Sequence, residues 1–287
     1  MKTVSLVLGS GGARGLAHIG VIHWLREHDY KIESISGCSI GALVGGIYAA
    51  GKLDEFEHWV RAIKKIDIVT LLDISFSKSG LVKGDKIINS LVELVGNQPI
   101  ENLPIRYTAV AADLVNEKEV WINTGSLFDA IRASISLPLF FTPHLRNGIK
   151  LVDGGVLIPV PIAPTFIDNT QMVIAVNLGG TVESNHTTIE DQTIPAEESP
   201  ILHEKIKGYI TRLQQNMNEI SGVDWSVYDI ANQSFDAMQS TIARQKLAAY
   251  PPDYTIEIAR NACGTLEFDR AGEMIALGYR MAQENLS

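Results

Sequence analysis

Three short motifs contain the residue types that carbonyl chemistry uses. The run at residues 37–41, GCSIG, matches the G-x-S-x-G pattern of a serine nucleophile. A glycine-rich run, GSGGARG, occupies residues 9–15, and DGG occupies residues 153–155. A serine that attacks a carbonyl carbon needs a base that takes its proton and N–H groups that hold the resulting oxyanion. The three motifs contain one candidate for each of these roles.

Ser39 is the candidate nucleophile because of the elements predicted on either side of it. The run Ile32–Ser36 predicts a strand, and Ile40–Ala50 predicts a helix. A sharp turn between them would hold the serine in a strained, exposed position, and Gly37 and Gly41 would avoid collisions with neighbouring backbone. The N-terminus of the helix also favours negative charge near the serine. The alternative interpretation is that Ser39 only caps the helix.

The glycine-rich run is interpreted as an oxyanion hole. It follows a predicted strand, Val4–Leu8, and opens a helix, so that successive N–H groups can point to one spot. A dinucleotide-binding fingerprint would need glycine in place of Arg14, and the phosphate-loop pattern G-x-x-x-x-G-K-[ST] is absent from this run. Arg14 either anchors the loop or attracts an anionic head group. The candidate oxyanion residues are Gly11, Gly12, Ala13 and Arg14, and the supporting glycines are Gly9 and Gly15.

Asp153 is the candidate base. Leu151 and Val152 predict the end of a strand before it, and Gly154 and Gly155 follow it. Backbone without side chains at those two positions can bring the carboxylate close to another loop. The alternative is a plain turn, because Asp-Gly is a common turn signal.

The elements that must position these motifs alternate between strand and helix. Strands are predicted at residues 4–8, 32–36, 107–112, 119–122, 172–176 and 254–258, and helices at residues 16–28, 40–50, 54–66, 85–95, 127–135 and 269–284. Such alternation is typical of a parallel sheet covered on both faces. We therefore expect a three-layer α/β/α fold with a mainly parallel central sheet. Residues 1–287 are expected to form a single domain with a polar loop and a helical insertion at about 181–250.

Composition limits the partners and the compartment. The formal net charge of −9 disfavours contact with nucleic acid phosphates. The two cysteines, Cys38 and Cys263, cannot form a disulfide framework and lack metal-ligand spacing, which fits a reducing cytoplasm. Neither a leader peptide nor a membrane-spanning run is predicted. No metal or other cofactor is expected.

The three motifs, in this order, resemble those of the patatin-like phospholipase family. Further likenesses are AHIGV at residues 17–21, ADL at 112–114 and SISLP at 134–138. The resemblance covers residues 4–178 well and residues 253–284 more loosely. Ser10 and Ile158 depart from the glycine and the asparagine that many members carry at those positions.

The resemblance implies a Ser–Asp dyad that works without histidine. Ser39 would attack an acyl ester, Asp153 would take its proton and later activate water, and the N–H groups of Gly11 and Gly12 would hold the oxyanion. The implied substrate is a glycerolipid or lysophospholipid, reached by transient contact with the inner face of the membrane and without calcium. The preferred head group, the acyl length and the oligomeric state do not follow from the sequence.

Two other classes of function remain open. A Ser-His-Asp hydrolase would need a histidine after Asp153, where only His186 and His203 occur, while His18 and His23 are interpreted as core or surface residues. The S-x-x-K match at residues 75–78 lacks the companion motifs of β-lactamases. The same fold could also bind a lipid or a protein without catalysis. In that case the amphipathic helices predicted at 200–250 could be core, lid or partner surface.

Overall fold

The computed structural model describes residues 1–63, 84–138, 140–182 and 225–287. Contacts between residues divide the chain into a main unit, Met1–His186 with Gln239–Ser287, and a second unit, Thr187–Met238. Residues 183–224 of the polar loop and helical insertion predicted at about 181–250 lie outside the described residues. The sheet and the three motifs all belong to the main unit.

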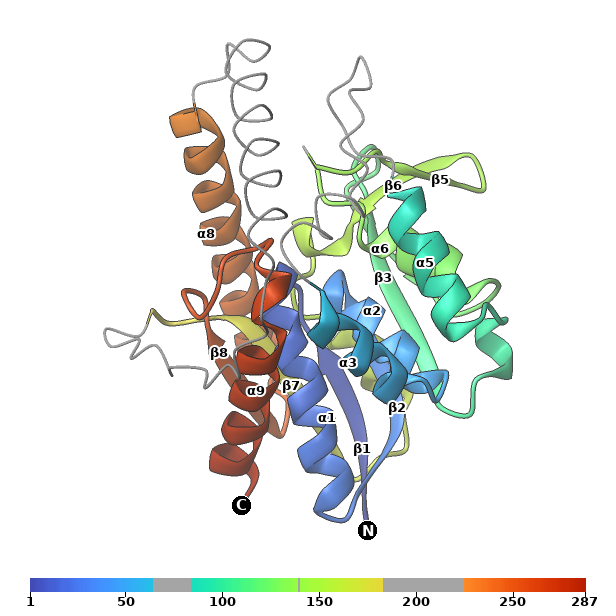
Figure 1. Ribbon diagram of the computed structural model, residues 1–287, viewed down its shortest axis with the longest axis vertical. Coiled ribbons are helices and arrows are strands. Elements are labelled where there is room, and N and C mark those ends of the chain that lie inside the picture. Colours follow the sequence, from blue (N-terminus) through green and yellow to red (C-terminus); the bar gives the residue numbers. More distant parts are fainter. Residues whose placement is uncertain (64–83, 139, 183–224) are drawn as a thin grey trace, which may run out of the picture. The chain divides into compact units, whose positions relative to one another are not determined.

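A mixed sheet of eight strands, counted over the described residues, forms the centre of the main unit (Figure 1). Five strands pair in parallel in the order β3-β2-β1-β7-β8, with the bounds Arg106–Asp113, Tyr30–Cys38, Lys2–Leu8, Met172–Gly180 and Tyr254–Ala259. The antiparallel strands beyond them are β4 (Lys118–Ile122), β5 (His144–Arg146) and β6 (Ile149–Asp153).

Helices follow the strands as the alternation predicts. They are α1 (Ala17–Glu27), α2 (Ile40–Ala49), α3 (Leu53–Ala62), α5 (Asp85–Val95), α6 (Leu127–Ser134), α8 (Trp225–Ala249) and α9 (Ala271–Leu286). Short 3-10 turns include η1 (Gly12–Leu16), η3 (Gly154–Val156), η4 (Ala163–Ile167) and η5 (Phe268–Arg270). No helix in the described ranges is both long and apolar enough to cross a membrane.

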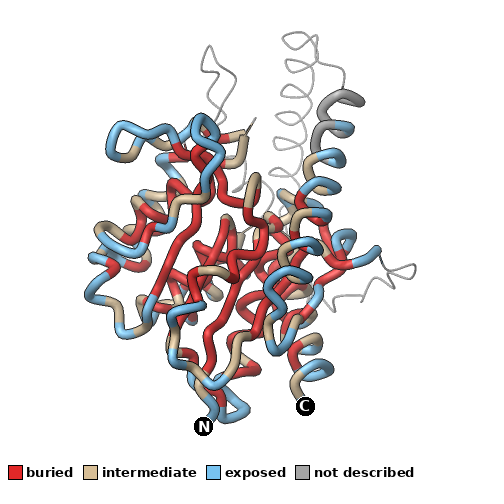
Figure 2. Tube along the Cα trace, turned by 180° about the vertical axis from the view of Figure 1, so that it is seen from behind, coloured by how far each residue is buried: buried red, intermediate tan, exposed pale blue. Residues whose placement is uncertain are grey.

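Apolar side chains on both faces of the sheet make the fold three-layered. Neighbouring residues of a strand point to opposite faces, and Leu6 of β1 belongs to the large core cluster that contains residues of α1, α2 and α9. Val7 and Ala175 belong to a second cluster with Ala243 of α8. Helices α1 and α9 therefore cover one face (Figure 1) and the second half of α8 covers the other, which Figure 2 shows from behind over buried strands. The three-layer α/β/α prediction is confirmed.

One edge of β3 brings two of the motifs together. β4 pairs with residues 109–113 of β3, so β2 and β6 share the opposite edge. β2 pairs along that edge as far as Val110, which faces Cys38. β6 takes over at the next residue, where Ala111 faces Asp153. The point where β2 turns into α2 and the end of β6 are therefore neighbours, which places Ser39 beside Asp153.

The predicted elements differ from the observed ones mainly at their ends. β2 continues through Gly37 and Cys38, and a 3-10 turn precedes α1 where a longer helix is predicted. The pattern does not predict β5, since its three residues are too few to show an alternation. α5 begins and ends at the predicted residues.

Candidate active site

Ser39 sits in a strained turn between β2 and α2. Its φ of 56° and ψ of −125° lie outside the regions that residues with a side chain normally adopt. Its hydroxyl makes no cap bond to the helix. Instead, Ser39 Oγ donates to Asp153 Oδ2 at 2.5 Å, and the Ser39 N–H donates to Ser134 Oγ at 2.9 Å. The hydroxyl is therefore aimed at the carboxylate and is not used to cap α2.

Asp153 is completely buried, and its carboxylate is held from several sides. Oδ1 accepts the N–H of Gly155 at 2.7 Å and lies 3.8 Å from the thiol of Cys38. The backbone N–H of Asp153 donates to the carbonyl of Ser136 at 2.9 Å. Burial raises the pKa of Asp153 from 3.8 to about 6, although hydrogen bonds from Ser39, Gly155 and Cys38 lower it. A carboxylate with this pKa is a stronger base than an exposed aspartate and is still ionised at neutral pH.

Three N–H groups of the glycine-rich run donate to carbonyls elsewhere in the protein. Gly9 donates to Val176 and Ser10 to Pro159, while Ala13 donates to the carbonyl of Thr265 at 2.9 Å. Within the described residues, the N–H groups of Gly11 and Gly12 have no acceptor. Gly12 lines the same pocket as Ser39. The structure thus leaves the N–H groups of Gly11 and Gly12 without an acceptor in the described residues, places Gly12 in the pocket with Ser39, and commits the N–H of Ala13 to Thr265.

Two buried side chains anchor this run. Arg14 is 4% exposed, and its Nη1 donates to the carbonyl of Arg260 at 2.5 Å, which is the anchoring alternative predicted for it. His18 is fully buried, and its Nε2 lies 2.9 Å from the carbonyl oxygen of Gly9. Burial lowers its pKa to about 4, so the ring is neutral at pH 7. The sequence interpretation of His18 as a core or surface residue missed its contact with the loop, which helical spacing alone does not reveal.

The supporting glycines share one property, which is that other atoms lie closer to them than a Cβ atom tolerates. At Gly154 a Cβ atom would collide with the carbonyl of Val110, the β3 residue that faces Cys38. At Gly41 a Cβ atom would collide with the carbonyl of Leu8, at the end of β1. The same holds for all the supporting glycines named from the sequence, which are Gly9, Gly15, Gly37, Gly41 and Gly154.

Ser134 at the end of α6 and Ser136 just beyond it hold the motif around Ser39 and the motif that begins at Asp153, a role that the sequence did not indicate. Ser134 Oγ accepts from Ser39 and donates to the carbonyl of Val110 at 2.6 Å. Ser136 offers its carbonyl to Asp153 and its hydroxyl to the guanidinium of Arg132 at 2.6 Å. The only signal for them in the sequence was the SISLP likeness.

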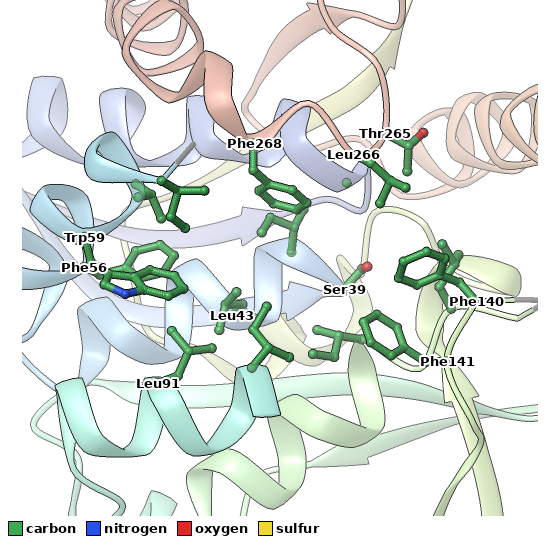
Figure 3. A pocket seen from close by; sticks show the side chains of 17 residues that line it. Ser39, Leu43, Phe56, Trp59, Leu91, Phe140, Phe141, Thr265, Leu266 and Phe268 are labelled. Carbon is green, nitrogen blue, oxygen red and sulfur yellow. The ribbon is translucent and has the colours of Figure 1, made fainter. Parts of the chain in front are cut away.

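An apolar pocket opens at Ser39 (Figure 3). Ser39 and Thr265 contribute hydroxyl groups to its lining and Gly12 has no side chain, while the remaining lining side chains are apolar except for the indole nitrogen of Trp59. They come from α2, α3, α5, the segment after α6 and the loop before α9. The site can therefore hold an apolar group beside a serine hydroxyl that is hydrogen-bonded to a carboxylate.

A comparison with known families matches this site and its fold. The sequence profile described as Patatin-like phospholipase matches residues 6–166, more than half of the 287 residues. The chain belongs to the patatin-like phospholipase family. The match confirms the resemblance seen in the three motifs, which lie at the ends of β1, β2 and β6.

Relatives of this patatin-like chain include proteins of very different length. An uncharacterized NTE family protein of Mycobacterium tuberculosis (strain ATCC 25618 / H37Rv) is 37% identical over 99% of this chain and 91% of its own length. Lysophospholipase NTE1 of Cryptococcus neoformans var. neoformans serotype D (strain JEC21) is 27% identical over 99% of this chain, which corresponds to 17% of that protein. Among solved structures, VipD from Legionella pneumophila aligns with a TM-score of 0.45 and 15% identity, over 99% of this chain and 66% of its own.

No histidine of the patatin-like chain contacts Ser39 in the ranges that the structure describes. His23 pairs with Glu57 and His144 with Asp129. His28 and His58 bond to backbone carbonyls, as His18 does. His186 and His203 lie outside the described residues. The described residues also contain no group of three or more His, Cys, Asp or Glu side chains that could hold a metal ion.

Proposed function

We propose that this chain hydrolyses acyl esters of lipids, with Ser39 as nucleophile and Asp153 as the only side-chain base. Membership of the patatin-like phospholipase family and the lysophospholipase relatives support lipid hydrolysis. The observation that carries the finer proposal is the direct hydrogen bond from Ser39 Oγ to Asp153 Oδ2 at 2.5 Å, made by a serine that lines an apolar pocket.

The first half of the proposed reaction forms an acyl-enzyme. Asp153 takes the proton of Ser39 as Oγ attacks the ester carbonyl carbon, and the carbonyl oxygen becomes an oxyanion. The free N–H groups of Gly11 and Gly12 stabilise that charge. The tetrahedral intermediate then collapses, the bond to the alcohol breaks, and the proton on Asp153 passes to the departing alkoxide. The acyl group is left on Ser39 and Asp153 is ionised again.

The second half returns the enzyme to its starting state. Water enters beside the acyl-enzyme, and Asp153 takes one of its protons as the oxygen attacks the acyl carbon. Collapse of the second intermediate releases a fatty acid, and the proton on Asp153 returns to Ser39 Oγ. The same carboxylate therefore serves as base twice, which its raised pKa favours because a stronger base accepts these protons more readily.

The pocket lining favours a lipid substrate over a polar ester. The apolar residues around Ser39 would bind an acyl chain with a gain that grows with the apolar surface removed from water. A lysophospholipid, with one acyl chain and a polar head group, fits a pocket of this kind. Its head group would remain outside the apolar lining.

Two substitutions and two matched controls test the proposal. Ser39→Ala and Asp153→Asn should each lower kcat for p-nitrophenyl esters and for lysophospholipid by about a thousandfold or more. Ser90→Ala on α5 and Asp54→Asn on α3 change the same residue types away from the site and should leave kcat unchanged. A fluorophosphonate probe should label Ser39 in the wild type and in both controls, and it should not label Ser39→Ala. Wild-type rates in Ser39→Ala would refute the nucleophile assignment.

The histidine mechanism is tested in the same assay. All five histidines of the described ranges bond to groups other than Ser39, which supports a base in direct contact with the serine. A His186→Ala/His203→Ala double variant should therefore keep wild-type kcat. A loss comparable to that of Asp153→Asn would instead favour a Ser-His-Asp triad.

A further inference from the structure

The pocket at Ser39 is longer than an ester group requires. Figure 3 shows Ser39 toward one end, Leu43 in the middle, and Phe56 with Trp59 at the opposite end. Leu43 lies one turn of α2 beyond Ser39. Phe56 and Trp59 stack with ring centroids 6.0 Å apart. The part of the pocket from Leu43 to this aromatic pair is called the far arm below.

The hydroxyl groups of the pocket lining lie at its serine end, and the far arm has one polar side-chain atom, the indole nitrogen of Trp59 (Figure 3). Figure 3 places Thr265 on the same side as Ser39, away from Trp59. The far arm is lined by side chains of α2, α3, α5 and the loop before α9, and these are apolar except for the indole nitrogen of Trp59: Leu43, Phe56, Trp59, Leu91 and Phe268. A head group with charges or several hydroxyls would lose its hydration there and find a single N–H group as partner. The far arm therefore suits an unbranched hydrocarbon chain.

We propose that the far arm is the acyl-chain site and that the Phe56–Trp59 pair sets the length of chain accepted. This inference rests on the proposed ester hydrolysis and supplies the acyl preference that the sequence left open. Phe56 is 1% exposed and Leu91 is fully buried, so the wall around the pair cannot widen without moving core side chains. Trp59 is half-buried and presents the larger ring. Replacing Trp59 with a smaller residue is therefore the substitution that should lengthen the arm.

The main test compares p-nitrophenyl esters from butyrate to palmitate. Trp59→Ala should move the kcat/KM optimum to longer chains, with about a fourfold gain for each methylene that finds room in the arm. Leu43→Phe fills the arm between Ser39 and the aromatic pair, and it should move the optimum to shorter chains. Trp121→Ala removes an exposed tryptophan of β4 outside the pocket and should leave the optimum where it is.

A binding measurement tests the arm without any turnover. A fatty acid with a terminal bromine quenches tryptophan fluorescence on contact, so a brominated dodecanoate bound in the far arm should quench Trp59 saturably. Trp59→Phe should lose this saturable component, whereas Trp121→Phe should keep it. Circular dichroism of each variant reports whether it is folded.

The two measurements separate failure of the acyl site from failure of the proposed activity. An unchanged chain-length profile in folded Trp59→Ala, with active wild type, would overturn the acyl site and leave ester hydrolysis standing. Saturable quenching that depends on Trp59 in a protein without turnover would support the acyl site and count against hydrolysis. Equal quenching in Trp59→Phe and in the wild type would overturn the acyl site whatever the activity.

Discussion

At the scale of single residues, the site depends on burying a carboxylate next to a hydroxyl. Asp153 has no exposed surface, and among the described residues its negative charge is supported by hydrogen bonds from Ser39, Gly155 and Cys38. Burial outweighs these bonds and raises the pKa to about 6. The carboxylate is thereby a better base than an exposed aspartate, while most molecules still carry it ionised at pH 7.

The raised pKa predicts the acid side of the pH profile. Only ionised Asp153 can accept the proton of Ser39, so kcat/KM should rise tenfold per pH unit below about pH 6 and level off above it. The measurement is kcat/KM for a neutral ester between about pH 4 and pH 8, which is about two units on either side of the pKa. Circular dichroism recorded at each pH shows whether the protein is still folded. A kcat/KM that is still above half its maximum at about pH 4, as the ordinary aspartate pKa of 3.8 would give, would contradict the role of burial.

At the scale of elements, α8 contacts both the glycine-rich loop and the aspartate turn. Gln239 is 8% exposed, and its Nε2 donates to Ser10 Oγ at 3.3 Å. A Cβ atom on Gly155 would collide with Gln239 Nε2 and lie 2.6 Å from Ser10 Oγ, so the three residues pack tightly. Gly155 in turn donates to Asp153. Ser10 departs from the glycine common in the family, and its contact with Gln239 gives that departure a physical role.

This contact predicts coupled effects of two substitutions on kcat. Gln239→Ala and Ser10→Gly each remove one partner of the same hydrogen bond, and each should lower kcat about fivefold by loosening the turn that holds Asp153. The double variant should be no slower than the slower single variant, because the second change removes nothing further. A double-mutant cycle on kcat, with thermal unfolding of all four proteins, measures the coupling. Additive losses would show that the two residues act separately.

How far the sequence predicts the site also differs from element to element. The strand and helix around Ser39 follow from local apolar patterns, and family motifs select Asp153 from among the aspartates. The pairing of β6 with the end of β3 joins residues about forty positions apart, and no local pattern encodes it. The same holds for Thr265, which binds Ala13 from the far end of the chain, and for Gln239. The local sequence patterns therefore do not predict contacts between segments that are distant in sequence.

At the scale of the whole main unit, the two ends of the chain are joined by a close helix crossing. A Cβ atom on Gly20 of α1 would collide with the carbonyl of Ile275 in α9, and one on Gly278 of α9 would collide with the carbonyl of Ala17 in α1. The backbones of the two helices thus touch at both positions. α1 begins directly after η1, which contains Gly12. The crossing therefore bears on the loop that carries the proposed oxyanion donors.

Gly278→Ala should consequently lower both stability and activity. The added methyl group must push α1 away from α9, and overpacking of this kind costs about 1–3 kcal/mol, although alanine by itself favours a helix by about 1 kcal/mol over glycine. Gly272→Ala is the matched control on the same helix, since its added Cβ would meet only a side-chain nitrogen of Arg61. Urea unfolding and kcat/KM of both variants test this.

Gly272→Ala should match or exceed wild-type stability. Gly278→Ala should lose stability and activity together, because α1 shifts with the glycine-rich loop attached to it. A stable Gly278→Ala with full activity would mean that the crossing can relax without moving that loop.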